Sequence, residues 1–140
     1  MIQHRKIWGF LILAFMMPGM LFPAVLLELR DIKQFKGSIM VGVFKSERDF
    51  KDHKQYKRFI RKATSHTMKV KINDLEPGWY MVAVFQDENE NGELDSSFLG
   101  PPTEPYGFSN NARGLLGAPS FEKAKFYYKG GELSLTIQLR

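Results

Sequence analysis

Hydrophobic and polar residues alternate with a period of two along most of the chain after residue 24. Successive side chains of a β-strand point to opposite faces, whereas an amphipathic helix has a period of about 3.6 residues. The alternation predicts seven strands, over residues 25–32, 38–45, 59–63, 68–73, 79–85, 121–128 and 132–139. Residues 46–57 are polar and predict a loop with a helical turn. Seven short strands with turn-rich connections indicate an all-β fold, a single β-sandwich over residues 25–140.

The strand over residues 79–85 is apolar on both faces, which predicts a central strand covered on both sides. The last strand is apolar on only one face, which is typical of a strand with a solvated outer surface. The predicted core takes the inward residues of these and the other strands. It consists of Val41, Val43, Val70, Ile72, Tyr80, Val82, Val84, Phe126, Leu135 and Ile137.

A long connection over residues 86–120 is rich in Gly, Pro and Asn and shows no periodicity. Loops of this length in a compact domain are usually functional or disordered. This segment is therefore the first candidate for a functional site.

The start of this connection carries an oxygen-bearing residue at every second position. The candidate calcium ligands are Asp87, Asn89, Asn91, Glu93 through its main-chain carbonyl, and Asp95. Gly92 stands where a metal loop needs a residue free to take positive φ. Calcium takes about six to eight oxygen ligands, and this run supplies most of them. An EF-hand has a bidentate Glu at the twelfth position, where this chain has Phe98, so the loop is EF-hand-like on another scaffold.

The alternative for this stretch is a tight hairpin turn at Asn91-Gly92 with solvated acids on either side. A bare turn does not require oxygen donors at alternate positions, and clustered acids repel one another without a cation. The sequence favours calcium as the cofactor.

The N-terminus has the composition of a secretory signal peptide. A short basic region ends at Lys6, and residues 7–17 are apolar without a charge. We expect a signal peptide over residues 1–24, with cleavage after Ala24, and export to the periplasm or beyond the cell. The alternative is an uncleaved membrane anchor formed by residues 7–27, although Pro18 and Pro23 disfavour a spanning helix.

Charge and cysteine content limit the partners. Removal of residues 1–24 lowers the net charge from +5 to +3, and the basic residues concentrate over residues 33–71. For an exported protein the expected partner of this basic region is an anionic envelope surface and not a nucleic acid, the alternative being a merely solvated face. The chain has no cysteine, which excludes disulfides, thiolate metal sites and a thiol nucleophile.

Two further stretches resemble known families. Residues 75–80, Leu-Glu-Pro-Gly-Trp-Tyr, resemble the corner that enters a central strand of prealbumin-like and collagen-adhesin-B-like sandwiches. Residues 106–114 and 117–121, together with the 87–95 loop, look like the exported bacterial family catalogued as domain of unknown function 2141. The resemblances imply an exported, single-domain, immunoglobulin-like or prealbumin-like sandwich, and they imply no established activity.

No catalytic constellation is recognisable. His53 and His66 are too far apart for a local zinc motif, and residues 107–111 lack the second glycine of a nucleophile elbow. We therefore expect a non-catalytic, calcium-stabilised envelope module that binds a protein, a glycan or an anionic surface. The alternative is a weak hydrolase or carbohydrate-processing enzyme that uses Asp87 and Asp95.

The candidate partner-binding residues lie at the end of the long connection. They are Tyr106, Phe108, Asn110, Asn111 and Arg113. The two aromatic residues could form an exposed platform or pin the loop to the sandwich. The two asparagines could complete the metal shell, fasten the loop onto residues 87–95 or satisfy turns, and Arg113 could pair with Asp95.

Overall fold

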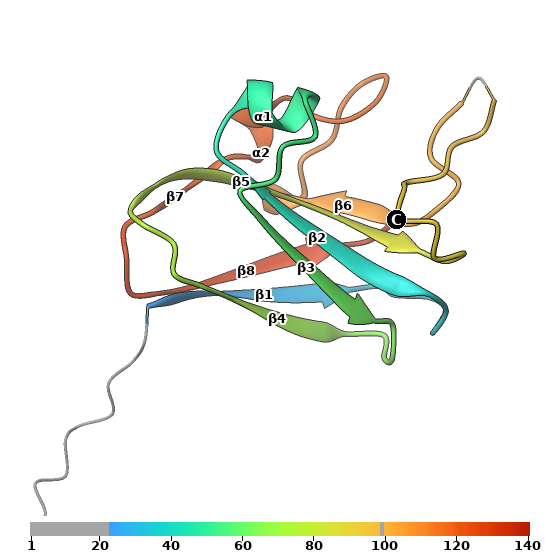
Figure 1. Cartoon of the computed structure of the whole chain (residues 1–140), viewed down its shortest axis with the longest axis horizontal. Coiled ribbons are helices and arrows are strands. Elements are labelled where there is room, and N and C mark those ends of the chain that lie inside the picture. Colours follow the sequence, from blue (N-terminus) through green and yellow to red (C-terminus); the bar gives the residue numbers. More distant parts are fainter. Residues whose placement is uncertain (1–22, 99) are drawn as a thin grey trace, which may run out of the picture.

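Two β-sheets pack face to face in the computed structural model, which describes residues 23–98 and 100–140 (Figure 1). The strands are β1 (Ala24–Arg30), β2 (Ser38–Phe44), β3 (Lys57–Lys62), β4 (Met68–Asn73), β5 (Gly78–Asp87), β6 (Tyr106–Phe108), β7 (Phe126–Tyr128) and β8 (Glu132–Gln138). The helices are short: α1 (Glu47–Lys51), the 3-10 helix η1 (Ser109–Asn111) and α2 (Phe121–Ala124). The prediction of an all-β sandwich is confirmed.

The smaller sheet has the order β4-β1-β8, and the larger sheet has the order β3-β2-β5-β6. In the smaller sheet β1 lies in the middle, antiparallel to β4 and parallel to β8. In the larger sheet β5 pairs with β2 along one edge and with β7 and then β6 along the other. The first and last strands of the domain are therefore hydrogen-bonded neighbours.

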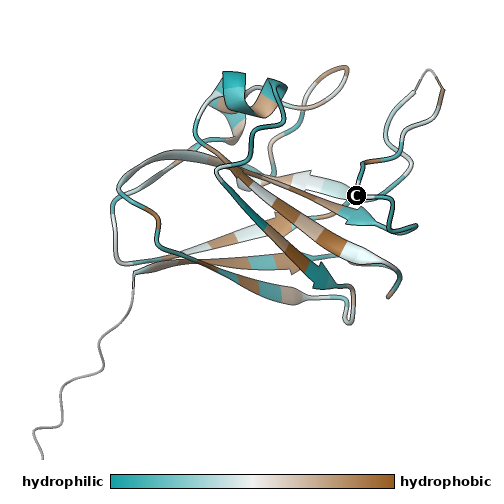
Figure 2. Cartoon of the chain, in the orientation of Figure 1, coloured by the Kyte–Doolittle hydropathy of each residue, from teal (hydrophilic) through white to brown (hydrophobic). Residues whose placement is uncertain are grey.

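The space between the sheets is filled by the inward residues of the alternating pattern, whose bands are visible along the strands in Figure 2. Nine of the ten predicted core residues are buried, and Leu135 is half-buried and packs against them. Strand β5 is buried on both faces, with Met81 inaccessible on one side and Val82 on the other, as predicted for a central strand. Strand β1 adds Val25, Leu27 and Leu29 to this core.

The corner before β5 is built around Tyr80. Its ring is buried, and its hydroxyl donates a hydrogen bond of 2.7 Å to the carbonyl oxygen of Glu76. Burial raises the pKa of the Tyr80 hydroxyl, because the ionised form would lose its hydration. The role predicted for this residue, a buried ring with a hydroxyl that caps the backbone, is confirmed.

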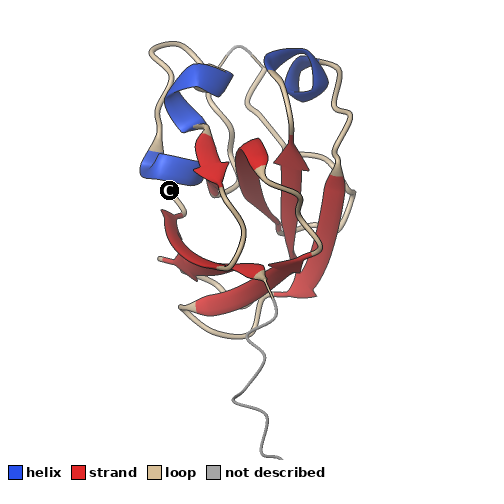
Figure 3. Cartoon of the chain, turned by 90° about the vertical axis from the view of Figure 1, so that its left-hand side faces the viewer, coloured by secondary structure: helices blue, strands red, loops and turns tan. Residues whose placement is uncertain are grey.

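A second apolar cluster lies on the outer face of the larger sheet and includes Met81, Phe108, Phe121 and Ala124. Helices α1 and α2 lie at the same end of the sandwich (Figure 3). The strand predicted over residues 121–128 is wrong in its first half, where residues 121–124 form α2. Phe121 and Ala124, three positions apart, lie on the same face of a helical turn, and both are buried in this cluster.

The predicted 86–120 connection contains ordered structure at its end. The Oγ atom of Ser109 is buried, accepts a hydrogen bond of 2.9 Å from the N–H of Val82 and donates one of 2.6 Å to the carbonyl of Ala124. These bonds hold η1 between β5 and α2.

One side of the sandwich is closed where β6 meets the end of β8. Tyr106 and Arg140 exchange two backbone hydrogen bonds, of 3.0 and 3.1 Å. Gly107 is the next residue of β6, and a Cβ atom there would stand 2.7 Å from the carbonyl oxygen of Gln138. A glycine at this position therefore permits the close approach of the two strands.

Most of the predicted signal segment lies outside the described residues. Strand β1 begins at Ala24, which is buried and donates a hydrogen bond of 2.9 Å to the carbonyl of Gly131. Within residues 23–98 and 100–140, none of the helices has the length and apolar character needed to cross a membrane.

Candidate metal loop and a neighbouring cleft

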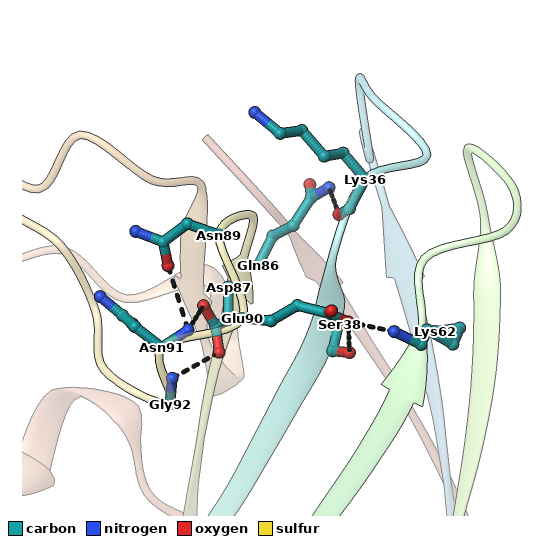
Figure 4. Close-up of polar contacts among 9 residues, drawn as sticks. All are labelled: Lys36, Ser38, Lys62, Gln86, Asp87, Asn89, Glu90, Asn91 and Gly92. Carbon is teal, nitrogen blue, oxygen red and sulfur yellow. Dashed lines mark hydrogen bonds and ion pairs between the residues drawn. The ribbon is translucent and has the colours of Figure 1, made fainter.

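The 87–95 loop is wound around the carboxylate of Asp87, the last residue of β5. This side chain is 3% exposed and accepts hydrogen bonds from the backbone N–H groups of Asn91 (3.1 Å) and Gly92 (2.8 Å) (Figure 4). Gly92 takes a φ of +84°, the left-handed conformation predicted for this position. The Asp87 carboxylate thus fixes the backbone of the loop.

The side chains of Asn89, Asn91 and Asp95 meet on the loop. The amide nitrogens of Asn89 and Asn91 donate to the two carboxylate oxygens of Asp95, at 2.5 and 2.8 Å. The amide oxygens of the same two asparagines accept from the backbone N–H two residues further along, at 3.2 and 2.9 Å. Three of the five predicted ligands therefore lie together.

Asp87 stands at the base of this loop, and the Glu93 side chain is exposed, as expected if that residue contributes only its carbonyl. In the described part of the chain, no group of three or more His, Asp or Glu side chains is placed to share a metal ion. A cation here would consequently depend on amide and carbonyl oxygens as well as on carboxylates.

Glu90 points away from the loop toward β2 and β3 (Figure 4). Its carboxylate forms an ion pair with Lys62 and accepts a hydrogen bond of 3.2 Å from the Ser38 hydroxyl. The hydrogen bond from Lys62, and then its charge, lower the pKa of Glu90. The charge of this acid is therefore balanced by a lysine.

Glu104 holds both ends of the loop, a role that was not predicted from the sequence. Its side chain is 5% exposed, and its two carboxylate oxygens accept from the N–H groups of Glu88 (2.8 Å) and Asp95 (3.0 Å). The available signal was a single acid within the Pro-rich run of residues 101–105. This carboxylate stabilises the loop in a closed form.

Asn110 and Asn111 do not reach the 87–95 loop, so two of the three alternatives given for them, the metal shell and the fastening onto that loop, are wrong. Asn110 donates to the carbonyl of Lys125 at 2.8 Å, and the Asn111 side-chain oxygen accepts from the N–H of Gln138 at 2.9 Å. Both asparagines have positive φ, 60° and 48°, which turns η1 toward α2 and β8. Among the described residues Arg113 forms no ion pair with Asp95 or any other acid.

Four of the five predicted partner-binding residues line one cleft of about 300 Å³ between β6, η1 and the end of β8. They are Tyr106, Phe108, Asn111 and Arg113. The rings of Tyr106 and Phe108 lie 5.9 Å apart in an edge-to-face arrangement. Phe108 is 7% exposed and pins the chain to the sheet, whereas Tyr106 is half-buried and faces the cleft.

A family model described as an uncharacterized protein conserved in bacteria, DUF2141, matches residues 27–136. The chain belongs to the DUF2141 family. The match runs from β1 into β8, so it spans the 87–95 loop and every residue of the cleft except Gln138 and Arg140.

No curated protein and no solved structure matches this DUF2141 chain. The family description names no activity, so a function for the chain has to be argued from its geometry.

Proposed function

We propose that this DUF2141 protein is an exported, non-catalytic binding or structural module of the cell envelope, stabilised by calcium in its 87–95 loop. The observation that carries the proposal is the meeting of the Asn89, Asn91 and Asp95 side chains at hydrogen-bond distance. Oxygen donors spaced along a loop reach a common cation only if the loop curls, and this one curls around Asp87.

The present contacts suggest how calcium would enter. The Asp95 carboxylate is compensated by two amide nitrogens, and a half-turn about the last side-chain bond of each asparagine replaces nitrogen by oxygen. A divalent cation would then take over the compensation of Asp95. The exchange gives up four local hydrogen bonds, the two to Asp95 and the two that the amide oxygens accept from backbone N–H groups, each with a net worth of about 1 kcal/mol.

The carboxylates of the loop are less suited to hydrolysis. Asp87 is buried and bound to two backbone N–H groups, and neither it nor Asp95 lines the cleft beside β6. Glycoside hydrolysis requires two carboxyl groups that flank an open substrate groove. The loop is therefore assigned to a cation and not to a substrate.

Export is supported by the composition of the N-terminus, a basic start followed by an uncharged apolar run. Mass spectrometry of protein from its natural host should find a mature chain that begins near Val25 and is released from membranes by high salt. Intact residues 1–24 on protein extracted from a membrane pellet would favour the anchor.

Thermal melting in calcium and in chelator tests the metal site. A site with an affinity near 10⁻⁵ M, in about 1 mM calcium, adds about 2.7 kcal/mol of stability. For a domain of this size the melting temperature should rise by about 10 °C. Magnesium should raise it less, because magnesium demands a tighter octahedron and releases its waters reluctantly.

Two variants distinguish the loss of a calcium ligand from the loss of one negative charge in the loop. Asp95→Ala should abolish the calcium response while it leaves the Asp87 cap in place. The matched control is Glu93→Gln, which removes one negative charge from the loop but keeps the main-chain carbonyl, so the response should persist. A wild-type protein with the same melting curve in calcium and in chelator would contradict the proposal.

A further inference from the structure

The charged side chains that line the cleft between β6, η1 and the end of β8 are all basic. Two arginines, Arg113 and Arg140, line it, and no acidic side chain does so among the described residues. Neither arginine belongs to any ion pair formed within residues 23–98 and 100–140. Two guanidinium groups without a carboxylate partner at one cleft are free to bind an anion.

The amide of Asn111 gives this cleft an oriented donor. Its oxygen is held by the N–H of Gln138, which directs the amide nitrogen elsewhere. Within the described residues that nitrogen has no protein acceptor, and the side-chain amide of Gln138, which also lines the cleft, has no protein partner either. Two arginines and two amides thus offer hydrogen bonds to a ligand with several oxygens.

One wall of the cleft is apolar. The half-buried Tyr106, the buried Pro119 and the half-buried Ala112 contribute to it. The position of the wall is fixed, because Tyr106 exchanges two backbone hydrogen bonds with Arg140, beside the C-terminus marked in Figure 1. A cleft of about 300 Å³ is at the lower end of the range for small-molecule sites, which suits one sugar ring.

We propose that this cleft binds an acidic sugar, a uronate unit, with the carboxylate on Arg113 and Arg140 and the ring against Tyr106. The amides of Asn111 and Gln138 then contact the sugar hydroxyls. The inference rests on the binding role proposed above and names the ligand class, but it does not depend on the calcium loop, because none of residues 87–95 lines the cleft.

Each feature of the cleft excludes a simpler ligand. A neutral sugar leaves both guanidinium groups without a counter-charge, and an inorganic anion leaves the Tyr106 ring unused. A purely apolar ligand would strip water from arginines that it cannot satisfy. A uronate ring with its carboxylate and hydroxyls satisfies all three sets of groups.

The test is an NMR titration of the full mature chain with three probes: D-glucuronate, D-glucose and inorganic phosphate. Glucuronate should shift the amide signals of residues 106–113 and 138–140 with an affinity of about millimolar, typical of a weak single-residue site. Glucose and phosphate should bind at least about tenfold more weakly.

Arg113→Gln should weaken glucuronate binding by about tenfold or more, because it removes a charge-assisted contact. The control is Arg48→Gln, which changes the charge equally on α1, where the side chain is 88% exposed and outside the cleft. The side chains of Arg113 and Arg48 are both exposed, so both variants should keep the wild-type melting temperature.

Glucose binding as tight as glucuronate binding would overturn the assignment of the arginines. Phosphate binding as tight as glucuronate binding would overturn the sugar and leave an anion site only. No shift with any probe, or equal losses in both variants, would overturn the site. Titrations in calcium and in chelator separate the two proposals, since a failure of the calcium melt leaves the expected glucuronate shifts unchanged.

Discussion

The carboxylate of Glu47 accepts a hydrogen bond of 2.5 Å from the backbone N–H of Phe121, 74 residues further along the chain. Glu47 begins α1 and Phe121 begins α2, so one side chain joins the two helices at the end of the larger sheet. The N–H of Phe121 is one of the unpaired donors at a helix start, which makes a carboxylate a suitable partner.

This contact predicts that the free energy of unfolding depends on pH in the acid range. The bond from Phe121, followed by the contribution of Lys51, lowers the pKa of Glu47 below its ordinary value of 4.5. The stabilisation is therefore present above pH 4.5 and is lost as the pH falls through the lower pKa of the folded protein. Because the side chain is 41% exposed, we expect only about 0.5–1 kcal/mol.

Urea unfolding of wild type and Glu47→Gln at a series of pH values measures this effect. The difference between the two proteins should shrink as the pH falls below 4.5. Asp52→Asn, which alters an exposed acid in the same segment, is the control. A Glu47→Gln difference that stays constant into strong acid would show that the contact does not involve the charge.

Removal of Glu104 should open the 87–95 loop. Glu104→Ala leaves the N–H groups of Glu88 and Asp95 without their acceptor, in a site where the carboxylate is 5% exposed. Loss of a buried acceptor for two donors costs about 2–4 kcal/mol. The measurement is the free energy of unfolding, together with hydrogen exchange at these two amides.

Glu93→Gln serves again as the comparison, because it removes an exposed acid from the same loop. Its unfolding free energy should stay within about 0.5 kcal/mol of wild type. Equal stability of Glu104→Ala and wild type would mean that Glu104 does not hold the loop.

Tyr80 should make the protein sensitive to alkali. Burial raises its pKa above 10.0, so the folded protein keeps the proton at pH values where the unfolded chain loses it. Stability should then fall as the pH rises from 10.0 through the pKa of the folded protein. Tyr80→Phe should remove this part of the decline, at a cost of about 1 kcal/mol for the hydrogen bond to Glu76.

The melting temperature between neutral pH and strong alkali tests this prediction. Tyr127→Phe is the matched control, because the side chain of Tyr127 is 51% exposed. An alkaline decline of the same slope in wild type and Tyr80→Phe would assign the decline to other groups.

The alternation of residues was enough to predict seven of the eight strands, because one face of such a strand is buried and the period of two records it directly. Strand β6 was not predicted, because its three residues are too few to show the period within the long connection. The alternation also failed at residues 121–124, where Phe121 and Ala124 fit a helical turn that is too short to display a period. The buried hydroxyl of Tyr80 followed from a local pattern, since its acceptor is only four residues away.

Hydrogen bonds between a side chain and backbone groups many residues away could not be predicted from the sequence. Glu104 binds N–H groups 16 and 9 residues away, and nothing in its neighbours reveals these partners. The spacing of oxygen donors in the 87–95 loop is visible in the sequence, but the hydrogen-bond partners of Asn110 and Asn111 are not. Those partners depend on the left-handed backbone conformation of both residues. Asparagine permits this conformation but does not require it.

The parallel pairing of β1 with β8 has a consequence for the order of assembly. The register joins Ala24 to Glu132 and Arg30 to Gln138, so the smaller sheet cannot be completed until β8, more than 100 residues after β1, is present. Pairings between chain ends carry a large loop-closure cost, and they slow folding. A ribosome that has not yet released the last strand therefore holds a chain whose earliest strand still lacks one of its two partners.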